Sequence, residues 1–115
     1  MATYTRLLLS GSTSGIPISL QTTTTTIHTA VAGSTAFDEV YLWATNAAAS
    51  TYTLTIQWGG TGATQRLVSA VAIPANSPPI PIATGQVVNG GVAITALSAT
   101  GNDGIFITGY VNRIQ

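Results

Sequence analysis

The chain has 115 residues, of which 45% are apolar and only 5% are charged, and its formal net charge is zero. An ordinary soluble domain devotes about a quarter of its residues to charged side chains. With no cysteine, the chain has neither a disulfide framework nor a thiolate metal site. Three arginines and no lysine argue against binding to nucleic acid or to an anionic membrane. The apolar content excludes charge-driven disorder, and the length predicts one domain, residues 1–115.

No stretch of the sequence approaches the ~18 consecutive apolar residues of a membrane span. The leucines at residues 7–9 form too short a run for the core of a secretion signal. A net charge near zero promotes association between proteins. We therefore expect a protein that is made in the cytoplasm and works inside an assembly.

Strand-forming segments occur about every ten residues, with turn residues between them. The predicted strands are, in chain order, residues 4–9, 16–20, 25–31, 37–45, 51–58, 63–73, 80–82, 92–97 and 105–111. Glycine-rich or Asn-Gly turns are expected at residues 58–62, 89–91 and 101–104, and no segment has the pattern of a helix. This spacing predicts an all-β fold, a single-domain β-sandwich or jelly roll of about eight or nine short antiparallel strands.

Two of these strands have informative patterns. In residues 51–58 apolar side chains alternate strictly with threonine and glutamine, which predicts one buried and one polar face. In residues 37–45 both parities are apolar, with Tyr41 and Trp43 on one and aliphatic side chains on the other. Such a strand is covered on both faces, either inside a sandwich or beneath a neighbouring subunit. Pro81 limits its short segment to a sheet edge, because proline cannot donate to a central ladder.

The residues that carry catalytic chemistry are too few to form a site. His28 is the only histidine and lies in a predicted strand, where we expect a hydrogen-bonded structural imidazole. Asp38 and Glu39 are adjacent, so they point to opposite faces and cannot act together across a glycosidic bond; we expect them to be solvated or ion-paired. The glycine-rich segment 59–64 lacks the Gly-Lys-Ser/Thr ending of a phosphate loop. We predict no catalytic, cofactor-binding or metal site, and no enzyme.

Aromatic side chains in the predicted strands suggest a second kind of site, a platform on which sugars stack. They are Tyr41, Trp43, Tyr52, Trp58, Phe106 and Tyr110. Packing within the protein is the commoner role of such residues in strands, and we expect it for most of them.

Several segments together resemble a known class of protein. They are residues 6–15 (RLLLSGSTSG), 27–33 (IHTAVAG), 37–43 (FDEVYLW), 54–60 (LTIQWGG) and 109–114 (GYVNRI). The chain resembles, over nearly its whole length, small proteins encoded beside the major capsid protein of tailed bacteriophages. The resemblance implies a capsid decoration, or cement, protein of the kind that forms β-rich trimers and clamps neighbouring capsid subunits.

We therefore expect a virion structural protein that binds and stabilises the phage head from the capsid surface, after synthesis in the host cytoplasm. Its expected partners are two further copies of itself in a homotrimer and the major capsid protein, with no cofactor, nucleic acid or membrane. The candidate interface charges are Arg6, Arg66, Arg113, Asp38 and Glu39.

The alternative function is a carbohydrate- or receptor-binding β-sandwich of the virion, on a head fibre, tail or neck. The two tryptophans distinguish the functions. An exposed Trp43 or Trp58 in a groove with polar neighbours would favour the alternative, whereas burial of both would favour the cement role.

Overall fold

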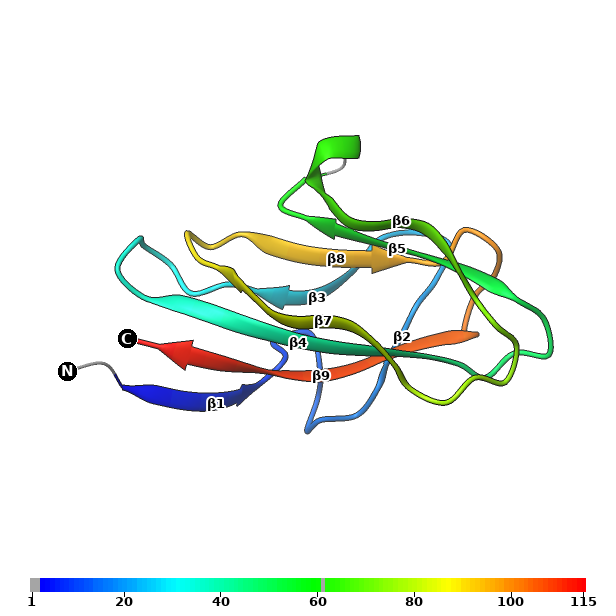
Figure 1. Cartoon of the computed structure of the whole chain (residues 1–115), viewed down its shortest axis with the longest axis horizontal. Helices are drawn as coiled ribbons and strands as arrows, with labels where there is room; N and C mark the ends of the chain where they lie inside the picture. The colour runs from blue at the N-terminus through cyan, green and yellow to red at the C-terminus, as the bar shows by residue number, and fades with distance from the viewer. Residues whose placement is uncertain (1–2, 61) are drawn as a thin grey trace.

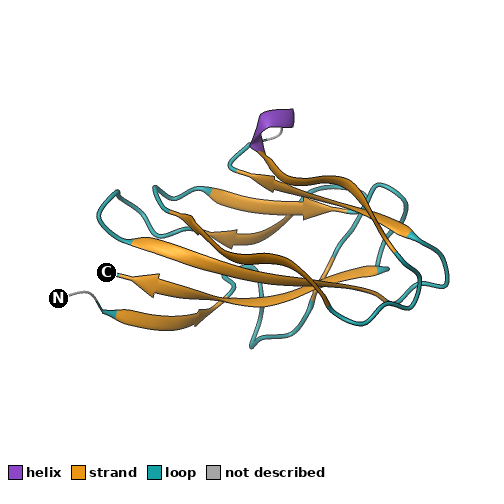
Figure 2. Cartoon of the chain, viewed as in Figure 1, coloured by secondary structure: helices purple, strands orange, loops and turns teal. Residues whose placement is uncertain are grey.

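A computed structural model describes residues 3–60 and 62–115 of the chain (Figure 1). Within these residues, nine β-strands form two antiparallel sheets, and the only helical element is the three-residue 3-10 turn η1, Ala63–Gln65 (Figure 2). The all-β sandwich predicted from the turn spacing is confirmed. Thr61, inside the predicted glycine-rich turn, lies outside the described residues.

The larger sheet, sheet A, has five strands in the order β1–β9–β4–β7, with β2 also paired to β9. The bounds of these strands are Tyr4–Leu8 for β1, Ile18–Ser19 for β2, Phe37–Asn46 for β4, Ile80–Val88 for β7 and Ile105–Ile114 for β9. Because β9 is ten residues long, β1 and β2 pair with different parts of it, at residues 110–114 and 106–107. β4 lies at the centre of the sheet, between β9 and β7.

The smaller sheet, sheet B, has four strands in the order β3–β8–β5–β6. Their bounds are Thr25–Thr29 for β3, Tyr52–Trp58 for β5, Arg66–Ile73 for β6 and Ala93–Leu97 for β8. β6 is therefore an edge strand of sheet B, and β7 is an edge strand of sheet A.

The bounds of several strands differ from the prediction, and the largest difference is the length of β7. We expected a short segment at residues 80–82, whereas β7 runs for nine residues. Pro81 lies on an edge strand, as its missing N–H requires. Register shifts between β4 and β7, at Val40/Tyr41 and at Leu42/Trp43, let the pairing continue past the proline. The predicted strand at residues 63–73 likewise begins only at Arg66, after η1.

The core lies between the two sheets and is almost entirely aliphatic. Its members are Leu9, Ile18, Leu20, Ile27, Ala30, Val40, Leu42, Ala44, Leu54, Ile56, Ile73, Ala83, Val88, Ile94, Ala96, Ile105, Ile107 and Val111. In β4 every second residue is buried, so Val40 and Leu42 face the core while Tyr41 and Trp43 face outward and are only partly covered. Among the described residues, no further layer covers the outer face of β4, which carries Tyr41 and Trp43.

Candidate functional site

Three side chains distant in sequence meet inside the sandwich. His28 comes from β3 of sheet B, Asp38 from β4 and Arg113 from β9 of sheet A. Arg113 donates from Nε to Oδ1 of Asp38 at 2.8 Å and from Nη2 to Oδ2 at 3.0 Å, while Nε2 of His28 lies 2.8 Å from Oδ2. The backbone N–H of Val31 donates to Oδ2 at 3.1 Å. Asp38 thus joins the two sheets through charge-assisted hydrogen bonds.

The second ring nitrogen of His28 determines the role of the imidazole. Nδ1 accepts a hydrogen bond from the backbone N–H of Ser10 at 3.0 Å, so the proton of the neutral ring lies on Nε2 and is donated to Asp38. The hydroxyl of Ser10 accepts from the backbone N–H of Thr29 at 2.7 Å. In a catalytic triad the serine hydroxyl donates to the imidazole, whereas here only the serine backbone contacts it. With His28 1% and Asp38 0% exposed, this cluster is structural.

The environment of Asp38 shifts its pKa in two opposing ways. Burial raises the pKa, but the hydrogen bonds from Arg113, His28 and Val31 outweigh burial and hold it below the ordinary value of 3.8. The hydrogen bond to Asp38 in turn raises the pKa of Arg113. The pair is therefore ionised under ordinary conditions.

The other two acidic residues lie apart from this cluster. Glu39 points to the opposite face of β4, as its adjacency to Asp38 predicted, and is partly exposed. Asp103 lies in a turn, where the hydroxyl of Ser19 and the amide of Gln21 donate to it and lower its pKa. No group of three His, Asp or Glu side chains that could hold a metal ion occurs among the described residues.

The outer surface of sheet A is rich in aromatic side chains, and we call it the aromatic face. It consists of Tyr4, Arg6, Leu8, Phe37, Glu39, Tyr41, Trp43, Val87, Phe106 and Tyr110. Tyr41 and Tyr110 are cross-strand partners whose ring centroids lie 4.8 Å apart with planes 17° apart. The ring of Trp43 lies 6.0 Å from that of Tyr110, and the guanidinium carbon of Arg6 lies 4.6 Å from the centroid of Tyr110. These contacts hold the rings in a fixed arrangement within the chain itself.

Exposed apolar side chains concentrate at the same surface. Within the described part of the chain, the large exposed ones are Val71, Ile16, Tyr4, Leu8 and Val87. The last three belong to the aromatic face, with exposed fractions of 71%, 54% and 58%, and only Val71 lies on sheet B. Ile16 and Phe106 line an apolar hollow of about 380 Å³ beside the face. We expected most aromatic rings to pack within the protein, and they do: Tyr52 and Trp58 pack against the core, whereas the rings of sheet A pack on one another outside it. The strand pattern shows which residues share a face, but not which face meets the core.

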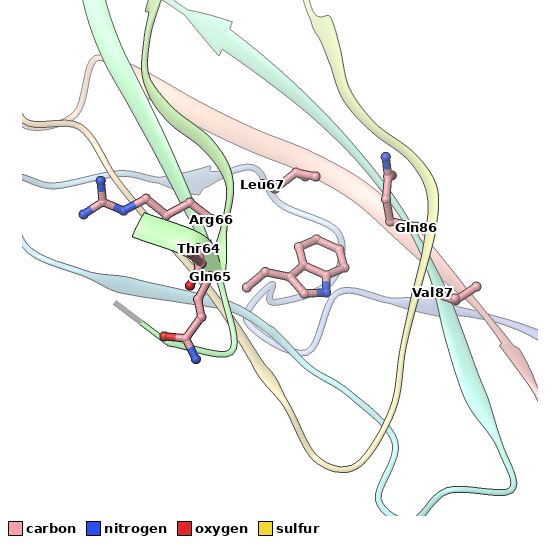
Figure 3. A pocket seen from close by; sticks show the side chains of 7 residues that line it. Thr64, Gln65, Arg66, Leu67, Gln86 and Val87 are labelled. Carbon is pink, nitrogen blue, oxygen red and sulfur yellow. The ribbon is translucent and has the colours of Figure 1, made fainter. Parts of the chain in front are cut away.

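A cleft of about 400 Å³, which shares Val87 with the aromatic face, lies between edge strand β6 and edge strand β7 (Figure 3). Its lining residues are Trp58, Thr64, Gln65, Arg66, Leu67, Gln86 and Val87. Trp58 has the parity of Leu54 and Ile56, so it faces the space between the sheets and is half-buried where the sandwich opens. Sequence reasoning missed Gln86 because residues 83–88 were not predicted as part of a strand.

The candidate interface charges divide into buried and exposed groups. Asp38 has no contact with solvent, so an interface role does not fit it, and Arg113 directs two guanidinium nitrogens to Asp38. Arg6 and Glu39 lie on the outer surface of sheet A, both in register with the same residue of β9. Arg66 is exposed at the cleft.

No helix in the part of the chain that the structure describes is long and apolar enough to cross a membrane. Comparison of the chain with family models, with curated proteins and with solved structures found no match. Its function is therefore inferred from its own sequence and surfaces.

Proposed function

We propose that the protein is a non-enzymatic structural component of a bacteriophage head, a decoration or cement protein that binds the assembled shell and stabilises it. Two features of the sequence support this proposal. The segments quoted above resemble proteins encoded beside the major capsid protein, and six charged residues with zero net charge favour life in an assembly. The observation that carries the proposal is the aromatic face, an ordered and largely apolar surface over which residues 3–60 and 62–115 place no covering layer.

The aromatic face is the proposed contact between copies in a homotrimer. Permanent interfaces between identical subunits are more apolar than other protein surfaces and are enriched in aromatic side chains. The exposed charges of this surface, Arg6 and Glu39, have opposite signs, so copies approach without net repulsion. Because Tyr41 and Tyr110 are already stacked, ordering their side chains on association costs little entropy.

Binding to the shell would account for stabilisation. A protein that binds assembled capsid subunits but not dissociated ones stabilises the assembly by mass action. The first test compares heads with and without the protein. Decorated heads should open at a higher temperature and survive stronger osmotic shock, and equal survival would contradict the cement role.

The second test addresses the trimer and uses two matched substitutions. Leu8→Lys places a charge on the aromatic face, at a side chain that is 54% exposed, whereas Val71→Lys does the same on sheet B, at a side chain that is 42% exposed. Both should fold, because neither residue is in the core. We expect light scattering to give a trimer for the wild type and for Val71→Lys but a monomer for Leu8→Lys. A monomeric wild type, or equal masses for the two variants, would refute the proposed interface.

A second candidate function is the carbohydrate- or receptor-binding module of a virion. The cleft at Trp58 favours it, because neither tryptophan is buried and Trp58 lies in a groove with polar neighbours. The aromatic face is less suited to sugars. A sugar stacks on an exposed ring face, and the rings of Tyr41 and Tyr110 cover each other.

A further inference from the structure

The cleft at Trp58 is formed by segments that are far apart in the sequence. Trp58 ends β5, Gln65 belongs to η1, Leu67 lies near the start of β6, and Gln86 and Val87 lie near the end of β7. Because β6 and β7 are the edges of their sheets, no further strand fills the space between them. The volume of about 400 Å³ is within the range of small-ligand sites.

The lining combines apolar and polar groups without acidic residues. Trp58, Leu67 and Val87 provide apolar surface, and the other lining side chains are a hydroxyl, two amides and one guanidinium. The lack of a carboxylate disfavours a cationic ligand, and a single arginine disfavours a ligand with several phosphates. A ligand with one apolar side and several hydroxyl groups matches this lining.

The hydrogen bonds around the cleft leave donors unused. The Oε1 atom of Gln86 accepts from the backbone N–H of Thr84 at 2.7 Å, and Oε1 of Gln65 accepts from that of Gly62 at 3.3 Å. These bonds orient both amides, and among the described residues the amide nitrogens have no acceptor.

The indole nitrogen of Trp58 is in the same situation. It also has no acceptor among the described residues. Because the described residues contain no buried side-chain nitrogen or oxygen without a partner, this nitrogen is accessible to solvent. The side chain of Gln65 lies against Gly60, so the N–H donors on the side of the cleft near the ring are the amide of Gln86 and the indole nitrogen itself.

We propose that this cleft binds one sugar unit of a neutral glycan. The apolar side of the sugar ring lies against Trp58. Its hydroxyl oxygens accept from the amide of Gln86 and from the indole N–H. The inference deepens the second function proposed above, and it does not require the cement role.

The test uses the purified full chain and defined oligosaccharides. The neutral probes are tetramers of β-1,4-glucose, β-1,4-N-acetylglucosamine, α-1,4-glucose and α-1,6-mannose, and the acidic probe is a tetramer of α-1,4-galacturonate. Titration calorimetry gives the affinity. The emission of Trp58, read in a Trp43→Phe background, reports whether the ligand reaches the cleft. We expect at least one neutral tetramer to bind and to shift this emission.

Two substitutions test the assigned contacts. Trp58→Leu keeps apolar volume but removes the ring, and it should weaken binding about tenfold or more. Gln86→Glu keeps the acceptor for the backbone N–H of Thr84 while removing the amide donor, and it should weaken binding severalfold even if Trp58→Leu does not fold. Gln115→Glu, an equal charge change at an exposed residue outside the cleft, is the matched control and should bind as the wild type does.

The possible results distinguish an error about the cleft as the binding site from an error about the carbohydrate-binding function. No binding of any neutral tetramer at ~10 mM would refute both this inference and the carbohydrate-binding function. Binding that is unchanged in Trp58→Leu or Gln86→Glu would refute the cleft as the site and leave the function standing. Tighter binding of the galacturonate tetramer than of every neutral one would refute the neutral class of ligand. None of these results bears on the stability of decorated heads.

Discussion

Replacing Asp38 by asparagine should destabilise the protein strongly, although the two side chains have nearly the same shape. Asp38 accepts hydrogen bonds from Arg113, His28 and Val31. Asparagine has one acceptor oxygen instead of two, so its NH2 group would face an N–H donor. The negative charge that compensates Arg113 would also be lost.

The magnitude follows from the burial of the pair. Removing one partner of a buried ion pair costs about 3–5 kcal/mol. The side chain of Asp38 is 0% exposed but that of Arg113 is 24% exposed, so water compensates part of the loss and the lower value applies. We therefore expect Asp38→Asn to lower the free energy of unfolding by about 3 kcal/mol. At about 4 °C per kcal/mol for a chain of this size, Tm should fall by about 12 °C.

The assay is denaturant and thermal unfolding at one fixed protein concentration, since self-association shifts apparent stability. Glu39→Gln is the matched control: it removes a carboxylate from the next residue, on the outer face, and should change stability by no more than about 0.5 kcal/mol. Arg113→Met should also destabilise, and the double variant should lose less than the sum of the two. An Asp38→Asn protein within about 0.5 kcal/mol of the wild type would refute the role assigned to this cluster.

Three further predictions concern pH, packing and attachment. The pKa of Asp38 is lower in the folded than in the unfolded chain, so its contribution to stability is present above about pH 4 and is lost as the pH falls through the folded value. The free energy of unfolding should therefore drop below about pH 4 in the wild type and less steeply in Asp38→Asn, where Asp103 gives the remaining slope. Equal slopes in the two proteins would contradict this. Gly109→Ala should lower the free energy of unfolding, measured with denaturant, by more than about 2 kcal/mol, because the new Cβ would overlap the backbone carbonyl oxygen of Tyr41. Gly33→Ala is the comparison: Gly33 has open space around it and a φ of +85°, so the substitution should cost only about 1 kcal/mol of backbone strain. Co-sedimentation of the protein with undecorated heads should be nearly unchanged between roughly 0.05 and 1 M sodium chloride. The reason is that exposed ion pairs contribute about 0–1 kcal/mol each, while apolar burial contributes about 25 cal/mol per Å². A steep loss of co-sedimentation with salt would show that a few charges dominate attachment.

The sequence alone determined the class of the fold and several local features. Period-2 alternation in residues 51–58 and regularly spaced turns are local properties, and they predicted an all-β sandwich correctly. The same periodicity placed Asp38 and Glu39 on opposite faces, since successive side chains of any strand alternate. Composition argues against nucleic acid and anionic membranes as partners, because binding to them requires clustered positive charges.

Only the tertiary structure decided which faces and which distant residues meet. Arg113 and Asp38 are 75 residues apart and become neighbours because β9 pairs with β4. Periodicity distinguishes the two faces of a strand but not the layer that each face contacts, so it could not show that Tyr41 and Tyr110 stack outside while the aliphatic side chains of β4 form the core. The cleft at Trp58 depends on β6 and β7 both lying at sheet edges, and strand order is set by pairing between segments that local sequence does not connect.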